Sequence, residues 1–197
     1  MNNIESLNIE LKNKGLIQTR NMDPLEVLVN TNVSSKPYQT ILIEFIDLLS
    51  GNELEMVIRA LPEKGIKGVS KKLIDILNNS NNYPNLDLWT VGNALNIIDD
   101  KSVYNDILKI CRNKDIGMAR QMLMSTLRKI NTEESFNILI ESLQDESIRG
   151  HAIEELGKWG DIRAIEPIQN TEVKKGLYEA RIKNKTIKKL KQAINNS

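Results

Sequence analysis

Residues 145–168 read DESIRGHAIEELGKWGDIRAIEPI. Ile148, Ala152 and Leu156 recur at four-residue spacing, which places them on one face of a helix. A glycine at position 160 is suited to end that helix, and Asp161 after it can cap the start of another. The segment therefore predicts two consecutive helices joined by a tight corner.

Apolar rows at the same helical spacing recur upstream. Shifting the sequence by 29 residues places Leu127 on Leu156, and a shift of 32 places Leu95 on Leu127. A further shift of 37 places Ile58 on Leu95. We therefore expect about four helix pairs over residues 37–168. Because a lone pair cannot bury its apolar face, neighbouring pairs should stack, which predicts an all-α fold, an α–α superhelix built as a solenoid of antiparallel helix pairs.

The two ends of the chain differ from this repeating middle. We expect a single domain over residues 1–197, with capping helices over 1–36 and a basic capping helix over 169–197. Residues 174–191 carry eight basic groups and one acid, so residues 1–173 hold 19 basic and 25 acidic groups, a net of −6. The alternative interpretation of this basic segment is a tail that binds nucleic acid or an anionic surface.

Composition limits the class of protein. The chain has 197 residues, 27% charged and 40% hydrophobic, which is typical of a globular protein. Its formal net charge of +1 gives no overall attraction for nucleic acid or anionic membranes. The start of the chain lacks a signal-peptide pattern, and no apolar run reaches the ~18–20 residues of a membrane span. We therefore expect a cytoplasmic protein without membrane contact.

Residues able to do chemistry are few. One cysteine and one histidine exclude an internal disulfide and any site that needs two imidazoles. Cys111 ends an apolar row and is expected to be buried, whereas His151 lies off the apolar row and is expected to be exposed. No phosphate-binding, metalloprotease or nucleophile-elbow motif is present. We therefore predict no catalytic residue, cofactor or metal ligand, and no enzyme activity.

Polar residues at the corners have expected structural roles. The residue that follows the second helix of each pair can cap the next helix. The aligned positions are Glu63, Asp100, Thr132 and Asp161. Glu63, which lies beside Pro62, fits this role poorly. Gly157 and Gly160 are both expected to supply a left-handed corner. Arg120 and Arg149 are expected to hydrogen-bond to neighbouring turns.

The corner pattern has a family resemblance. The segment resembles a HEAT repeat of the bacterial phycobilisome-lyase-like type. The resemblance rests on an acidic turn followed by Ile148-Arg149, Ala152 and the run Leu-Gly-x-x-Gly-Asp that ends at Asp161. The match covers residues 133–168 and extends in part to 102–132, where Arg120 is present but the Gly-Asp is not. Upstream only the periodicity supports it. The resemblance implies an α-solenoid used for binding other macromolecules, and it implies no reaction.

The same resemblance implies that the second helix of each pair lines a concave surface. The non-core positions of those helices form a mixed face of apolar groups, amides and hydroxyls, with acids toward both ends. Such a face suits a protein partner with a basic component better than a phosphate backbone. The expected partner-binding residues are Glu53, Thr90, Asn93, Met122, Ser125, Thr126, His151, Glu154 and Glu155.

The expected function is therefore a non-enzymatic, monomeric scaffold that binds a protein through its concave face. An immunity or antitoxin-type protein and a regulatory adaptor are two concrete versions. One alternative is a DNA-binding enzyme of the HEAT-like glycosylase kind, in which Trp89 and Trp159 would stack on bases, although nucleic acid is not the expected partner because residues 1–173 are net acidic. The other is a phycobilisome-lyase-like accessory protein, for which Cys111 gives weak support.

Overall fold

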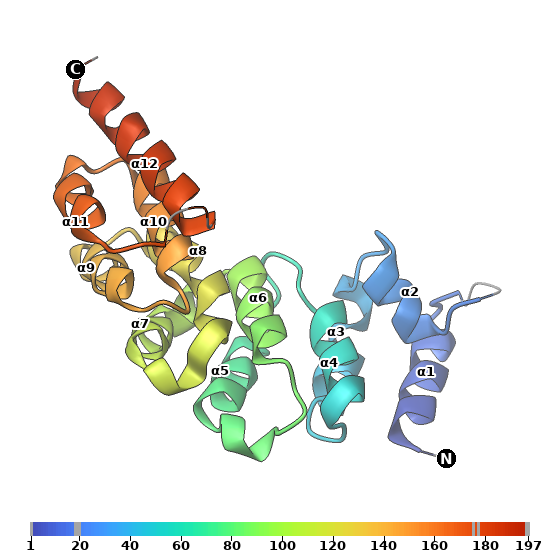
Figure 1. Cartoon of the computed structure of the whole chain (residues 1–197). Coiled ribbons are helices and arrows are strands. Elements are labelled where there is room, and N and C mark those ends of the chain that lie inside the picture. The colour runs from blue at the N-terminus through green and yellow to red at the C-terminus, as the bar shows by residue number, and fades with distance from the viewer. Residues whose placement is uncertain (1, 18–20, 175, 177, 196–197) are drawn as a thin grey trace. The chain divides into compact units, whose positions relative to one another are not determined.

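A computed structural model describes residues 2–17, 21–174, 176 and 178–195. The remaining positions of the expected terminal capping segments lie outside the described residues. All the regular structure described is helical, which confirms the all-α prediction (Figure 1). The α-helices are α1 Asn3–Asn13, α2 Pro24–Asn30, α3 Gln39–Phe45, α4 Gly51–Ala60, α5 Ser70–Asn78, α6 Leu88–Ile98, α7 Tyr104–Arg112, α8 Arg120–Ile130, α9 Glu133–Glu141, α10 Arg149–Trp159, α11 Ile165–Asn170 and α12 Tyr178–Asn195.

Residues 1–103 and 104–197 form two compact units. In the first, α1 packs against α2 and α3, while α4 packs against α2, α3 and α6. A capping box between Asn2 and Glu5 starts α1, and Asp23 and Glu26 make the same arrangement at α2, so each helix begins where its sequence satisfies the free backbone N–H groups. Leucine and isoleucine side chains with no exposed surface form the core, among them Leu7, Leu11, Leu42, Leu54, Ile58 and Leu73.

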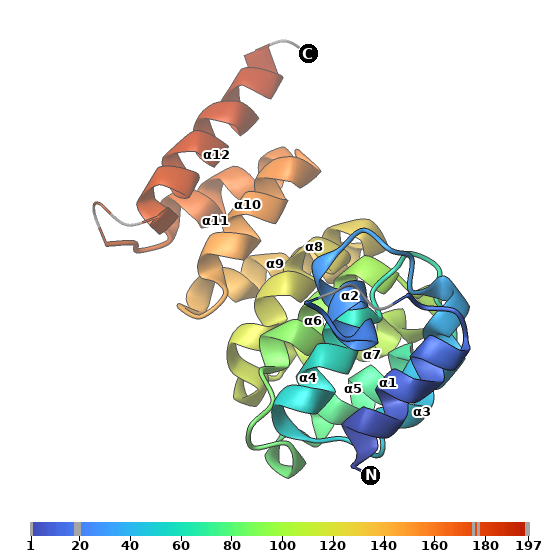
Figure 2. The same cartoon turned by 90° about the vertical axis from the view of Figure 1, so that its right-hand side faces the viewer.

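The second unit, residues 104–197, is built around α8 and α10. Helix α8 packs against α7, α9 and α10, and α10 packs against α9 and α12. The C-terminal helix α12 also contacts α11, so it lies along two helices of its own unit (Figure 2). The predicted apolar rows are buried here, since Leu127, Ala152 and Leu156 have no exposed surface.

Three helix corners share one backbone geometry. Asp99, Asn131 and Gly160 each end a helix with a left-handed conformation, at φ values of 57°, 56° and 87°. They are separated by the shifts of 32 and 29 residues seen in the sequence, so the repeated pattern produces a repeated corner. The side chain of the next residue accepts a hydrogen bond from the start of the following helix, as predicted, in Asp100, Thr132 and Asp161.

The corner at Pro62, which lies in the first unit together with the Asp99 corner, is built differently. Pro62 takes the place of the left-handed residue, and its fixed negative φ excludes that conformation. The Glu63 carboxylate accepts hydrogen bonds from the Ser34 hydroxyl at 2.8 Å, from the Ser35 backbone N–H and from the Lys36 N–H at 3.3 Å. Glu63 therefore caps the short 3₁₀ helix Lys36–Tyr38, which lies earlier in the chain, and not the helix that follows it.

The predicted left-handed conformation of Gly157 is wrong. It lies inside α10 and has no left-handed φ, in contrast to Gly160. A Cβ atom at Gly157 would lie 2.8 Å from Cγ2 and 2.9 Å from Oγ1 of Thr186 on α12. The glycine is needed because α12 approaches α10 closely at this point, which a local sequence pattern cannot reveal.

Candidate functional site

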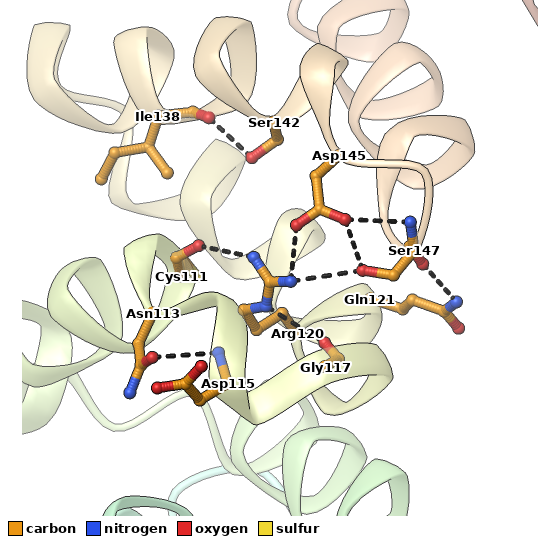
Figure 3. Close-up of polar contacts among 10 residues, drawn as sticks. All are labelled: Cys111, Asn113, Asp115, Gly117, Arg120, Gln121, Ile138, Ser142, Asp145 and Ser147. Atoms are coloured by element: carbon orange, nitrogen blue, oxygen red, sulfur yellow. Dashed lines mark hydrogen bonds and ion pairs between the residues drawn. The ribbon is translucent and has the colours of Figure 1, made fainter.

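A buried arginine fixes the start of α10 against α8. Arg120 is 2% exposed and donates to the backbone carbonyls of Gly117 at 3.1 Å and Cys111 at 3.4 Å. Its other bonds reach Asp145 Oδ2 at 2.6 Å and Ser147 Oγ at 3.2 Å (Figure 3). Since a buried guanidinium needs such partners, Arg120 has the structural role expected from the sequence.

Neighbouring groups complete this cluster. Burial acts to raise the pKa of Asp145, but hydrogen bonds from Ser147 and Arg120 outweigh it and lower that pKa below its ordinary value. The Gln121 side chain donates to the Ser147 carbonyl at 2.7 Å (Figure 3). Arg149 also has its expected structural role, since it donates to the Leu143 carbonyl at 2.8 Å.

Cys111 lies beside this cluster and is buried, as predicted. Desolvation raises the pKa of its thiol to about 12, against the opposing influence of Arg120 and Arg112. The thiol therefore stays protonated at neutral pH and is a poor nucleophile.

The α8–α10 hollow is the candidate site. It has a volume of about 270 Å³. Five of the nine residues predicted from the sequence line it, namely Met122, Ser125, His151, Glu154 and Glu155. Gln121 and Lys158 line it as well, and the sequence reasoning missed both. Lys158 could have been predicted from the sequence, because it lies four residues after Glu154 on the same helix face.

The two glutamates of the hollow are already paired. Glu155 is 5% exposed and accepts from Arg128 Nε at 2.7 Å and from Lys158 Nζ at 2.6 Å. Glu154 lies 3.0 Å from Lys158 Nζ and accepts from the Tyr178 hydroxyl at 3.0 Å. The hydrogen bond from Lys158 is the main reason that the pKa of Glu154 lies below its ordinary value. Their negative charge is therefore balanced within the protein.

His151 differs from its predicted exposure. The side chain is half-buried at the edge of the hollow. Desolvation lowers the pKa of the imidazole, although Glu154 and Glu155 act to raise it. A neutral ring that can both donate and accept a hydrogen bond is therefore favoured at neutral pH.

The remaining predicted residues are more scattered. Thr126 on α8 is completely buried, so it offers no surface to a partner. Glu53 on α4 is exposed and Asn93 on α6 is half-buried. Thr90, also on α6, is only 6% exposed. These three belong to the first unit.

The two tryptophans do not line the hollow. The Trp159 ring packs edge-on against Phe136, with centroids 5.4 Å apart and an angle of 71° between the planes. Arg163 lies over the same phenylalanine at 4.6 Å. Trp89 is 38% exposed, on α6. Trp159 is therefore part of the packing between α9 and α10.

No protein-family model, curated protein or solved structure matches this chain. Among the described residues, no helix is long and apolar enough to cross a membrane. In the same part of the chain, no three His, Cys, Asp or Glu side chains gather as a metal site would require.

Proposed function

We propose that the protein is a non-enzymatic, HEAT-like repeat scaffold that binds a protein partner through the α8–α10 hollow. The observation that carries this proposal is that predicted partner-binding residues from two helices line the same hollow. Met122 and Ser125 of α8 meet His151 of α10 in one hollow, although they were selected only by their register in a repeat.

The lining of the hollow suits a protein surface. Met122 supplies an adaptable apolar contact, and Gln121, Ser125 and His151 supply hydrogen-bonding groups of both kinds. The charges of Glu155 and Lys158 are balanced within the hollow, so it lacks the excess of cations that binding to a phosphate backbone requires. Protein interfaces commonly combine apolar contacts with hydrogen-bonding groups in this way.

An immunity or antitoxin-type protein and a regulatory adaptor are the two versions of this function that we propose, acting as a monomer in the cytoplasm. They differ in genetic context. The immunity version predicts that a toxin gene lies beside the gene for this chain and that the toxin binds directly to the purified protein.

Affinity capture from extracts of the source organism tests the proposal. Ser125→Arg would place a long charged side chain in the hollow, and Asn137→Arg makes the same charge change at an exposed position on α9. We expect the wild type and Asn137→Arg to retain one stoichiometric protein after nuclease treatment, and Ser125→Arg to lose it. Recovery of nucleic acid with nuclease-sensitive proteins would contradict the proposal and favour the DNA-binding alternative.

A further inference from the structure

Helix α12 has one face packed on its unit and one face open. Thr186 and Leu190 are buried at 6% and 1% exposure, and Lys183 Nζ donates to the carbonyls of Gln169 and Thr171 at 2.8 and 2.6 Å. The opposite side carries exposed basic and amide side chains, namely Arg181, Asn184, Lys185, Lys188, Lys191 and Gln192. The helix is therefore amphipathic, with a polar face that contains no acid.

The cations of this open face have no partner within the described part of the chain. Arg181, Lys185 and Lys188 recur at spacings of four and three residues, which places them along one side of a helix. Together they span ~10 Å of helix axis. The one acid of α12, Glu179, faces Arg149 at 3.7 Å. The stripe formed by Arg181, Lys185 and Lys188, here named the basic stripe, thus carries unbalanced positive charge.

A small hollow borders the basic stripe. It lies between α10 and α12 and has a volume of about 140 Å³. Ile182 and the backbone of Gly157 give it an apolar part, and its other lining residues are Thr186, Glu154, Lys158, Lys185 and Lys189. Cavities of ~150 Å³ hold a molecule the size of benzene, so the volume of the α10–α12 hollow is of the size of one leucine side chain. Lys189 at its rim donates to the Gly157 carbonyl at 2.7 Å.

We infer that the basic stripe and the α10–α12 hollow together dock an acidic amphipathic segment of a protein partner. Carboxylates of that segment would lie over Arg181, Lys185 and Lys188, and one apolar side chain would enter the hollow. The inference rests on the proposed function, because Glu154 and Lys158 line both this hollow and the α8–α10 hollow. The inferred partner segment is acidic, in contrast to the basic partner expected from the sequence. The acidic Glu154 and Glu155, on which that expectation rested, are balanced by cations of their own unit.

Two features favour an acidic protein segment over nucleic acid. The stripe is one helix wide, whereas duplex binding commonly uses phosphate contacts from several elements. None of the described residues that line the neighbouring hollow is aromatic, and the exposed Tyr178 of α12 is held by a hydrogen bond to Glu154, whereas binding of single strands commonly uses several rings on which bases stack. Helix-in-groove recognition instead combines apolar anchors with complementary charge at the rim.

Fluorescence anisotropy with a synthetic probe tests the inference. The probe is a short labelled helical peptide of glutamate and alanine with one central leucine. We expect the full chain to bind it at low salt and binding to weaken as salt rises. The combined change Arg181→Gln, Lys185→Gln, Lys188→Gln should weaken binding about tenfold. Lys14→Gln, Lys64→Gln, Lys71→Gln removes the same charge from exposed positions of the first unit and should leave the affinity unchanged.

The probe itself tests the hollow without altering the protein. Replacing its leucine by alanine should weaken binding severalfold. No binding of the glutamate peptide by the wild type, or equal loss in both triple variants, would overturn the inference. Tighter binding of a duplex DNA of matched charge, lost in the α12 variant, would assign the stripe to nucleic acid and overturn it too. If the captured partner is lost on Ser125→Arg yet retained by the α12 variant, the inference fails and the proposed function stands.

Discussion

Two charged side chains, one in each compact unit, are held by hydrogen bonds of different kinds. In residues 1–103, Glu63 reaches back about one helix pair to cap the 3₁₀ helix at Lys36–Tyr38. In residues 104–197, Arg120 is buried among backbone carbonyls and Asp145. A buried charge requires specific partners at specific positions, whereas apolar packing accepts many side chains of suitable volume. The Asp99 corner of the first unit keeps the left-handed geometry of Asn131 and Gly160, so the departure at Pro62 and Glu63 is local to that corner.

Removing the buried arginine should have the largest effect on stability. Arg120→Ala would remove the guanidinium partner of the part-buried Asp145 carboxylate and the side-chain bonds to two carbonyls, which we expect to cost ~3–5 kcal/mol. Arg112→Ala is the control, because Arg112 pairs with Glu134 at 2.7 Å on an exposed surface and should cost less than ~1 kcal/mol. Urea denaturation measures both. Equal effects would contradict the importance given to the burial of Arg120.

The close contact between α10 and α12 should come next. Gly157→Ala would press its methyl group against Thr186, at an expected cost of ~1–3 kcal/mol. Thr186→Ala in the same chain should recover most of that loss, because it removes Cγ2 and Oγ1. Thermal melting of the two single variants and the double variant measures the coupling. Failure of the second change to restore stability would contradict the close-approach explanation.

Low pH should weaken the contributions of Glu63 and Asp145 to the stability of the fold. Burial acts to raise the pKa of Glu63, but bonds from Ser34, Ser35 and Lys36 lower it, as similar bonds do for Asp145. A carboxylate with a lowered folded-state pKa stabilises the fold above its unfolded value, ~4, and loses that contribution as pH falls through the folded value. Stability should therefore decline below about pH 4.

Glu63→Gln and Asp145→Asn separate the two contributions to this acid sensitivity. Each variant should be less stable than the wild type at neutral pH by ~1–2 kcal/mol and should show a shallower decline in acid. Denaturation midpoints measured at several pH values give the comparison. An unchanged pH dependence in either variant would contradict the role given to that carboxylate.

The smallest expected effect concerns a left-handed corner. Asn131→Gly keeps the φ of 56° and removes the strain of a side chain in that conformation, so we expect stabilisation of up to ~1 kcal/mol. Pro62→Gly is the comparison in the first unit, where no left-handed residue is needed, and should not stabilise. A rise in melting temperature for Pro62→Gly equal to that for Asn131→Gly would contradict the difference between the corners.

Local patterns predicted much of the fold. The buried rows through Leu127 and Leu156, the caps at Thr132 and Asp161, and the structural role of Arg120 all follow from residue type and helical spacing. These features depend on neighbours within a turn or on the adjacent helix, which a single sequence can reveal.

Contacts over longer separations could not be predicted. Glu63 bonds to residues about 28 positions upstream, and Glu155 is neutralised by Arg128, 27 positions away. The position of Thr186 against Gly157 depends on where α12 docks. Met122 and Ser125 line the α8–α10 hollow, and their positions follow from helical register, whereas the pairing of the neighbouring Glu155 with Arg128 depends on contacts between helices.

The most direct test of the α8–α10 hollow is hydrogen–deuterium exchange of the captured complex against the free protein. The proposed function predicts that binding slows exchange in α8 and α10, centred on the peptides that contain Ser125 and His151, while α4 stays unchanged. Protection confined to residues 1–103, with α8 and α10 exchanging as in the free protein, would contradict it.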